Sequence, residues 1–345
     1  MWSETLAALN FADGLPASKG QIKHSPDDFK VEENLGFELS GEGEHLFLLI
    51  EKKLLNTEDM LKIIAHQFKL PYKSISYAGL KDKFATTIQW FSVHLPGITD
   101  PDLSCLNAEN HRLLKAMRHN KKLKVGALKE NHFHIKIHDF VYDEQELNTR
   151  IETIKSYGVP NYFGLQRFGN QGRNLDRAGE LLLENKKIKD RHLRGIYYSA
   201  ARSFLFNLIL HTRINEGCWN VAVAGDLMML AGSHSVFAID AVTDEIKDRV
   251  IEHDIFPAAP LWGVGSELLH ANALQLQTSA LEPWRQWCTS LERHGLQKLY
   301  RSLVLMPKTL QFADNTFSFS LPPGAYATTV LRELVNTSTA SGEDV

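Results

Sequence analysis

The order in which strand-like and helical patterns follow one another constrains the fold of this chain of 345 residues. The first third mixes strand and helix patterns, residues 144–295 are largely patterned as helices, and a strand pattern returns after residue 305. A helical block between two strand-rich segments is typical of one domain inserted into another, because the two ends of a domain often lie close together. At roughly 150 residues per domain, the length also predicts about two domains.

The first third of the chain contains patterns for three strands and one helix. Residues 45–50, HLFLLI, form a short apolar run that suits a buried strand. Asn56 offers an N-cap for a helix over 57–69, whose apolar residues recur at helical spacing. Residues 74–78 and 88–94 are rich in β-branched and aromatic residues and predict strands on either side of the loop GLKDKFAT.

Further along, strict alternation in FHIKIH predicts a half-buried strand over 133–138, with Phe133 on one face and His134 and His138 on the other. Helical spacing predicts four helices, over residues 147–154, 174–184, 197–215 and 279–295. The end of the chain predicts a strand over 317–321 and, after the turn LPPG, a helix over 328–336.

The charge of the chain is unevenly distributed. A formal net charge of −3 excludes a uniformly basic nucleic-acid-binding protein. Residues 111–129, in contrast, hold seven lysines and arginines and no acid, and apolar residues interleave with them. The segment is either a solvated basic face or a contact for a polyanion such as RNA. In the second interpretation the RNA-binding residues are Arg118, Lys121, Lys122 and Lys124.

Cysteine usage and hydropathy indicate a cytoplasmic protein. Cys105, Cys218 and Cys288 are odd in number and widely spaced, which fits neither a disulfide framework nor a CxxC metal site. The N-terminal residues have no apolar core of a signal peptide, and no apolar run is long enough to span a membrane.

Asp82 in GLKDKFAT is the first candidate for catalysis. Lysines flank it on both sides, and Gly79 permits an unusual loop backbone nearby. A fixed, ionised carboxylate can act as a nucleophile or a base. The alternative is a surface aspartate that pairs with a lysine.

Other motifs carry less chemistry. GEGEH at 41–45 has a lone GxG, which predicts a tight turn before the 45–50 strand and not a dinucleotide site. His132, His134 and His138 could share one strand face as metal ligands, but Lys136 on that face would oppose a cation. A row of solvent-facing histidines is the alternative, and we expect no metal.

Five segments together resemble the TruD family of tRNA pseudouridine synthases. They are HSPDDFKVEENLGFELSGEGEH at 24–45, GLKDKFATTIQW with Asp82, RHNKKLKVGALKENHF at 118–133, VPNYFGLQRFG at 159–169 and LPPGAYATTVLREL at 321–334. They follow the family's order and extend over nearly the whole chain.

The resemblance implies an α+β fold and an activity. Residues 1–156 and 306–345 would form a pseudouridine synthase catalytic domain, with a mixed, mainly antiparallel sheet that is circularly permuted relative to other synthases. Residues 157–305 would form a mainly helical TruD insertion domain. The implied reaction isomerises uridine-13 of tRNA to pseudouridine, after the base is flipped out of its helix.

The resemblance also implies roles for individual residues. Asp82 would be the catalytic nucleophile, Asn131 would hold it by a hydrogen bond, and Phe133 would stack on the flipped base. Lys23, Glu33 and Tyr326 match motif positions that would line the same cleft. The reaction needs no cofactor, nucleotide or metal, and the expected partner is tRNA, bound by a cytoplasmic monomer without membrane association.

One position departs from the family pattern. The family usually has Lys-Gly-Asn where this chain has Lys129, Glu130 and Asn131. If the glycine requires a positive φ, Glu130 is strained, and if it gives room to RNA, Glu130 adds a negative charge. This motivates an alternative function, a non-catalytic tRNA-binding protein on the same scaffold. A metal-dependent nuclease built on the His132 face is a third hypothesis.

Overall fold

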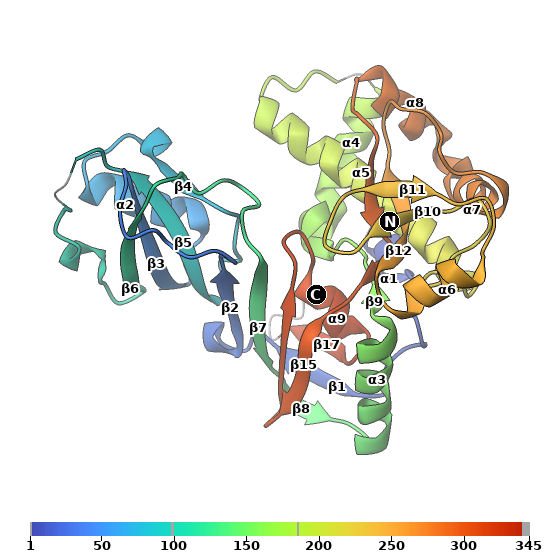
Figure 1. Ribbon diagram of the computed structural model, residues 1–345, viewed down its shortest axis with the longest axis horizontal. Helices are drawn as coiled ribbons and strands as arrows, with labels where there is room; N and C mark the ends of the chain where they lie inside the picture. The colour runs from blue at the N-terminus through green and yellow to red at the C-terminus, as the bar shows by residue number, and fades with distance from the viewer. Residues whose placement is uncertain (1, 98–99, 185, 340–345) are drawn as a thin grey trace. The chain divides into compact units, whose positions relative to one another are not determined.

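The computed structural model describes residues 2–97, 100–184 and 186–339, and its contacts divide the chain into two compact units (Figure 1). The first unit comprises Met1–Pro16, Glu152–Met306 and Thr328–Leu334. The second unit comprises Ala17–Ile151, Pro307–Ala327 and Val335–Val345. The contacts thus group residues 1–16 and 328–334 with the helical segment. The assignment of a catalytic domain and an insertion domain, with the boundaries given above, stays a prediction.

The second unit is built on an eight-stranded sheet. Its order is β15-β16-β7-β2-β5-β3-β6, and β4 pairs with β5 outside this path. β2 and β5 run parallel, and the other described neighbours run antiparallel. The strands are β2 (Phe29–Asn34), β3 (His45–Lys53), β4 (Ile75–Tyr77), β5 (Thr86–His94), β6 (His111–His119), β7 (Glu130–Lys136), β15 (Lys308–Ala313) and β16 (Thr316–Leu321).

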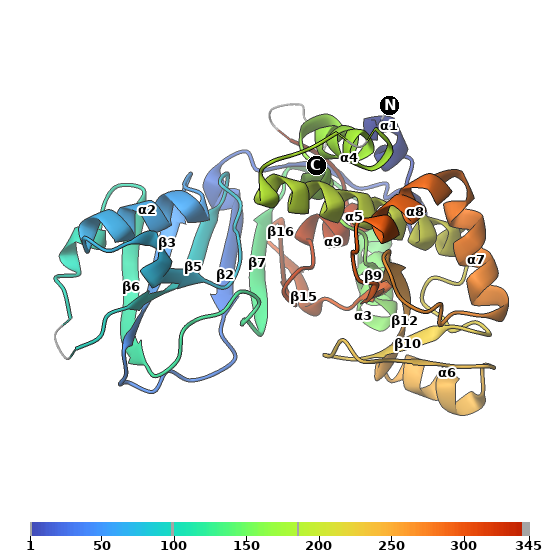
Figure 2. The ribbon, with the colours of Figure 1, turned by 90° about the horizontal axis from the view of Figure 1, so that it is seen from above.

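Helix α2 (Thr57–Gln67) covers one face of this sheet, as Figure 2 shows. The Asn56 side chain accepts a hydrogen bond from the Asp59 N–H at 2.8 Å, which is the N-cap predicted from the sequence. Met60 and Ile64 pack on the buried face of β3, including Leu48. A second core, with Phe47 and Trp90, lies on the opposite face. The sheet is therefore covered on both faces, which holds its strand ends in place.

A small three-stranded sheet in the second unit has the order β17-β1-β8. It contains β1 (Lys19–Ile22), β8 (His138–Val141) and β17 (Asn336–Thr339). A Cβ at Gly20 would overlap the Ile137 side chain, so glycine allows β8 to approach β1 closely. The predicted strand 133–138 is wrong at its end, because β7 stops at Lys136 and His138 belongs to β8.

The first unit contains helices and a sheet. The sequence patterns did not predict this sheet. This sheet has the order β11-β10-β12-β13 and is antiparallel throughout its described pairs. Its strands are β10 (Leu227–Leu230), β11 (Val236–Ala238), β12 (Ile255–Leu261) and β13 (Leu299–Ser302). A short pair, β9 (Val159–Pro160) with β14 (Val304–Leu305), joins the two ends of the helical segment.

The helices outside α2 include three of the four predicted in the middle of the chain, with changed bounds. They are α1 (Trp2–Ala7), α3 (Glu144–Tyr157), α4 (Arg173–Leu183), α5 (Arg191–Asn215), α6 (Asp244–Ile251), α7 (Ala271–Leu281), α8 (Arg285–Arg293) and α9 (Ala327–Arg332). The single helix predicted over 279–295 is wrong: Pro283 lies in a 3₁₀ turn that separates α7 from α8. The helix predicted over 328–336 stops at Arg332, because Asn336 begins β17.

The elements confirm the α+β fold with mainly antiparallel sheets. None of the helices in the described residues is long and apolar enough to cross a membrane.

Candidate active site

Asp82 and Lys23 form an ion pair in the second unit. Asp82 lies in the loop between β4 and β5, and its Oδ2 accepts a hydrogen bond from Lys23 Nζ at 2.9 Å. Lys23 follows β1 in a left-handed conformation, with φ 57°, which turns the chain at this point. The Asp82 side chain is 42% exposed, whereas Lys23 is 15% exposed. The carboxylate is therefore held by a lysine and still open to a substrate.

An aromatic cluster lies beside this ion pair. Lys23 Nζ lies 4.8 Å from the centroid of the Phe29 ring, a cation–π contact. The Phe133 ring stacks on Phe319 with centroids 5.6 Å apart and meets Phe29 edge-on at 6.3 Å. Because Phe133 is 8% exposed, most of its ring already packs against protein. A base can stack on Phe133 only through the small exposed part or after the neighbouring side chains move.

Asn131 does not make the hydrogen bond that we expected. It pairs with Glu33 across β7 and β2, and its Oδ1 is buried and has no hydrogen-bond partner in the part of the chain that the structure describes. The Asp82 carboxylate instead accepts a hydrogen bond from Lys23, which comes directly after β1. Asn131 therefore offers an unused buried acceptor on the sheet face that carries Phe133.

Glu33 is the centre of a buried network that includes two lysines. Its Oε1 lies 2.5 Å from Lys81 Nζ, and its Oε2 accepts a hydrogen bond from the Trp90 N–H at 2.8 Å. Burial raises the pKa of Glu33, and the nearby Lys81 opposes this shift. Burial also lowers the pKa of Lys52 to about 8, with the charge of Lys81 acting in the same direction. Glu33 thus fixes the residue that precedes Asp82.

The sequence patterns did not identify Lys52 and Lys81 as site residues. A signal for Lys52 is present in the alternation of β3, where Leu48, Ile50 and Lys52 share the buried face. A lysine that continues a buried alternation needs a polar partner, and Lys52 Nζ donates to the Leu55 carbonyl at 2.7 Å. For Lys81, the only signal in the sequence is its position beside Asp82.

Tyr326 lies in the loop that follows β16 and is half-buried. The last pair of that strand joins Leu321 to Asn131, so the loop starts at the strand end where Asn131 lies. Its place in the proposed cleft stays a prediction.

The basic loop 120–129 is anchored beside the Asp82 loop. Leu123 is buried in the core with Trp90, and the Gly126 N–H donates to the Ala78 carbonyl at 2.7 Å. Lys121, Lys122 and Lys124 are exposed on this loop. Three exposed cationic side chains are therefore held on a loop whose Gly126 is hydrogen-bonded to Ala78, four residues before Asp82.

Arg118 has a different environment from these lysines. Its guanidinium donates to Asp100 and to the Leu95 carbonyl, both at 2.7 Å, and to the Gly43 carbonyl at 3.2 Å. A Cβ at Gly43 would lie 2.5 Å from the His119 carbonyl, which explains why the GEGEH turn needs glycine there. Arg118 thus stabilises this turn, and we remove it from the proposed RNA contact.

Glu130 is neither strained nor on the side of Asn131. It lies in regular pairing with Asn34 in β7 and is not among the residues with positive φ. Neighbouring residues of a strand point to opposite faces, so Glu130 faces away from Asn131. There it accepts a hydrogen bond from the Asn34 side chain at 3.4 Å.

The three histidines considered as metal ligands are not together. His132 and His134 pair with the hydroxyls of Ser320 and Ser318 on β16, at 2.5 and 2.9 Å. His138 lies in the other sheet, 2.9 Å from Asp28. The observation behind the nuclease hypothesis is therefore wrong.

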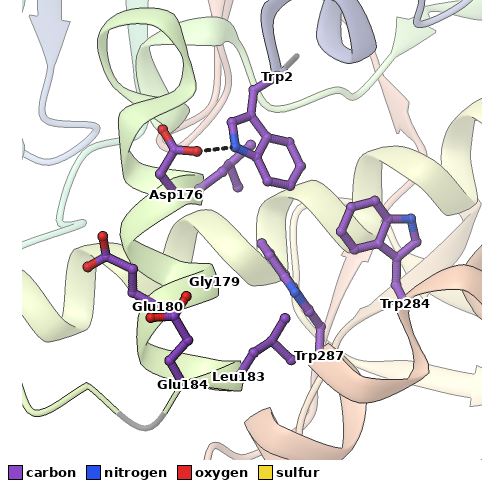
Figure 3. A pocket seen from close by; sticks show the side chains of 9 residues that line it. Trp2, Asp176, Gly179, Glu180, Leu183, Glu184, Trp284 and Trp287 are labelled. Carbon is purple, nitrogen blue, oxygen red and sulfur yellow. Dashed lines mark hydrogen bonds between the residues drawn. The ribbon is translucent and has the colours of Figure 1, made fainter.

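A pocket of about 480 Å³ lies elsewhere, in the first unit, lined by Trp2, Trp284 and Trp287 (Figure 3). Two of its carboxylates have partners: Asp176 accepts a hydrogen bond from the Trp2 indole at 2.6 Å, and Glu180 pairs with Arg177 and Lys186. None of the predicted site residues lines it.

The fold and site thus define an α+β protein with an exposed, lysine-paired aspartate beside an aromatic cluster and a basic loop. Residues 6–190 and 186–334 match the sequence model of the family described as tRNA pseudouridine synthase D (TruD). The chain belongs to this family, which confirms the resemblance seen in the sequence.

Individual relatives agree with this membership. A Legionella pneumophila (strain Corby) protein named tRNA pseudouridine synthase D is 47% identical over 329 residues, 94% of this chain and 97% of the relative. The Aeromonas salmonicida (strain A449) protein of that name is 41% identical over 339 residues, 97% and 96% of the two chains. A crystal structure of a Methanosarcina mazei protein assigned to TruD has a TM-score of 0.70 at 21% identity, and covers 96% of this chain and 97% of its own. At 21% identity, this structural similarity supports the fold alone.

Proposed function

We propose that this protein isomerises uridine to pseudouridine at position 13 of tRNA, with Asp82 as the nucleophile. The observation that carries the proposal is the Lys23–Asp82 ion pair, in which an exposed carboxylate is held by the ammonium group of a lysine that is only 15% exposed. Membership of the TruD family supports the reaction class. The target base must leave its helix to reach such a carboxylate.

The reaction requires one glycosidic bond to break and a carbon–carbon bond to form. Asp82 attacks either C1′ of the ribose or C6 of the uracil ring, and the bond between C1′ and N1 breaks. The uracil then rotates, its C5 bonds to C1′, and the bond between Asp82 and the substrate breaks, which returns the carboxylate. The proton on C5 passes to water, and N1 gains a proton from water. Lys23 orients the attacking carboxylate and supplies a positive charge next to it when electrons move onto the uracil.

The surrounding residues suit the detached uracil. The buried, unpartnered Oδ1 of Asn131 can accept a hydrogen bond, and uracil N3–H is a donor. Phe133, Phe29 and Phe319 supply an apolar wall on the same sheet. Lys121, Lys122 and Lys124 contact tRNA phosphates, which positions the RNA without reading its sequence. We further propose that the protein acts as a monomer in the cytoplasm.

The non-catalytic alternative has lost its motivation, because Glu130 faces away from Asn131. The test compares Asp82→Asn with Asp59→Asn, using purified protein and unmodified tRNA. Asp59 is a matched control, since it pairs with Lys62 and its side chain is 38% exposed, close to the 42% of Asp82. We expect Asp59→Asn to form pseudouridine normally and Asp82→Asn to form none while still binding tRNA. Pseudouridine formation by Asp82→Asn would exclude Asp82 as the nucleophile.

A further inference from the structure

Two histidines and an aspartate converge at the edge of the small sheet. The metal-binding atoms of His24, Asp28 and His138 all lie within 4.8 Å of one another, and this is the one such cluster among the described residues. His24 and Asp28 come from the turn after β1, and His138 begins β8. Asp28 is buried, and His24 is exposed.

The Asp28 carboxylate is oriented by its own turn. The Ser25 N–H donates to Asp28 Oδ2 at 2.5 Å, which fixes the side chain. The other oxygen, Oδ1, lies 2.9 Å from His138 Nε2. Carboxylates that ligate metals are typically held by such a hydrogen bond from outside the metal site. Neighbouring Asp27 cannot substitute for Asp28, because it pairs with Lys53 and Thr86.

The imidazole rings of His24 and His138 lie close to each other and to the Asp28 carboxylate. Their rings lie 5.0 Å apart at an interplanar angle of 32°. His138 Nε2 is buried and has no well-aligned hydrogen bond to any of the described residues, although it lies 2.9 Å from Asp28 Oδ1. A buried ring nitrogen without a hydrogen bond is costly, and a metal ion would satisfy it. His24 is exposed, so its ring can move to complete the ligand set.

The backbone around these residues is set before any ion binds. Lys23 and Asp139 have φ values of 57° and 46°, in the left-handed region, and they flank His24 and His138 in sequence. Gly20 lets β8 lie close to β1, which brings His138 to the turn. The cluster therefore does not depend on a flexible loop.

We propose that His24, Asp28 and His138 bind a Zn²⁺ ion. Two imidazole nitrogens and one carboxylate oxygen are ligands that Zn²⁺ uses, whereas Mg²⁺ and Ca²⁺ prefer oxygen alone. Three protein ligands leave one position for water. The ion would join the turn to β8 next to Lys23, and its role is to hold that segment; it takes no part in the isomerisation. This revises the expectation of no metal.

The test titrates the metal-free, reduced full-length protein with Co²⁺, followed by displacement with Zn²⁺ and calorimetry of Zn²⁺ alone. We expect one equivalent of Co²⁺ to give the absorption of a low-coordinate site and one Zn²⁺ to displace it. His24→Ala and His138→Ala should each weaken Zn²⁺ binding by at least about tenfold, since even outer-shell changes cost about 10–100-fold. His134→Ala is the control, because its partner is Ser318.

Two results would overturn the proposal. One is the absence of stoichiometric Zn²⁺ binding by the wild-type protein. The other is unchanged Zn²⁺ affinity in His24→Ala, whose exposed side chain can be removed without disturbing the core, since the ion would then bind elsewhere. The titration contains no RNA, so a failure to bind Zn²⁺ would not contradict the proposed isomerisation. Conversely, pseudouridine formation by Asp82→Asn would exclude the proposed nucleophile without contradicting the metal site.

Discussion

Lys81 Nζ lies 2.5 Å from Glu33 Oε1, while the next residue, Asp82, pairs with Lys23 at 2.9 Å. Two consecutive residues of one loop are thus tied to β2 and to the end of β1. The Lys81–Glu33 pair is buried, and the Lys23–Asp82 pair is partly exposed. We infer that the buried pair sets the position of the loop and that the exposed pair serves the chemistry.

Removing the charge of Glu33 should destabilise the protein strongly. Glu33→Gln leaves Lys81 without its anion in a buried site, for which the free energy of unfolding falls by about 3–5 kcal/mol. Urea denaturation measures this change. Asp59→Asn, which breaks the exposed pair with Lys62, should cost at most about 1 kcal/mol. Equal costs for the two variants would contradict a buried network around Glu33.

Lys52 should make stability depend on pH under alkaline conditions. Burial lowers its pKa to about 8 from the ordinary 10.5. Between these values the unfolded chain binds a proton that the folded protein has released, so the free energy of unfolding rises with pH. The rise is at most about 1.4 kcal/mol per pH unit for one proton. Denaturation between about pH 8 and 10 should show a smaller rise for Lys52→Met and an unchanged one for the exposed Lys62→Met. A wild-type slope in Lys52→Met would show that Lys52 titrates normally.

Lys122 should contribute to tRNA affinity through phosphate. Lys122→Ala should weaken binding across different tRNA sequences and lower the slope of log affinity against log salt by about 1. Binding at several salt concentrations measures this slope. Lys62→Ala, on α2, is the control for a lysine outside the basic loop. If the slope for Lys122→Ala equals that of the wild type, the loop does not contact phosphate.

Arg118 should behave as a structural residue. Arg118→Ala removes hydrogen bonds to the carbonyls of Leu95 and Gly43 and an ion pair with Asp100. Hydrogen bonds from a charged group contribute about 1.5–3 kcal/mol each, so the free energy of unfolding should fall by a comparable amount. The salt slope of tRNA binding should stay that of the wild type. A lower slope with unchanged stability would return Arg118 to the RNA contact.

The sequence predicted elements where the local pattern and the tertiary environment agree. The N-cap at Asn56 and the alternation around Phe133 both express local rules, and both are present in the structure. The sheet formed by β10 to β13 was not predicted, because its strands are short and β12 contains Pro257 and Pro260. The break at Pro283 was available in the sequence but was outweighed by the helical spacing of the tryptophans.

The site was predictable as a set of residues but not as a set of contacts. Asp82 was a candidate from its flanking lysines, and the family resemblance assigned it the role of nucleophile, whereas its pairing with Lys23 depends on a left-handed turn after β1 that no pattern specifies. Lys52 and Lys81 converge on Glu33 only when β2 and β5 pair in parallel, a long-range arrangement. The cluster of His24, Asp28 and His138 likewise forms only because the chain leaves the large sheet after β7 and β8 pairs with β1 in the small sheet.

Site-resolved mapping of pseudouridine in cellular tRNA tests the central claim most directly. The comparison is between cells that lack this protein and the same cells supplied with the wild type or with Asp82→Asn. Pseudouridine at position 13 should be absent without the protein, present with the wild type, and absent with Asp82→Asn at equal protein abundance. Pseudouridine at position 13 in cells that carry only Asp82→Asn would contradict the account.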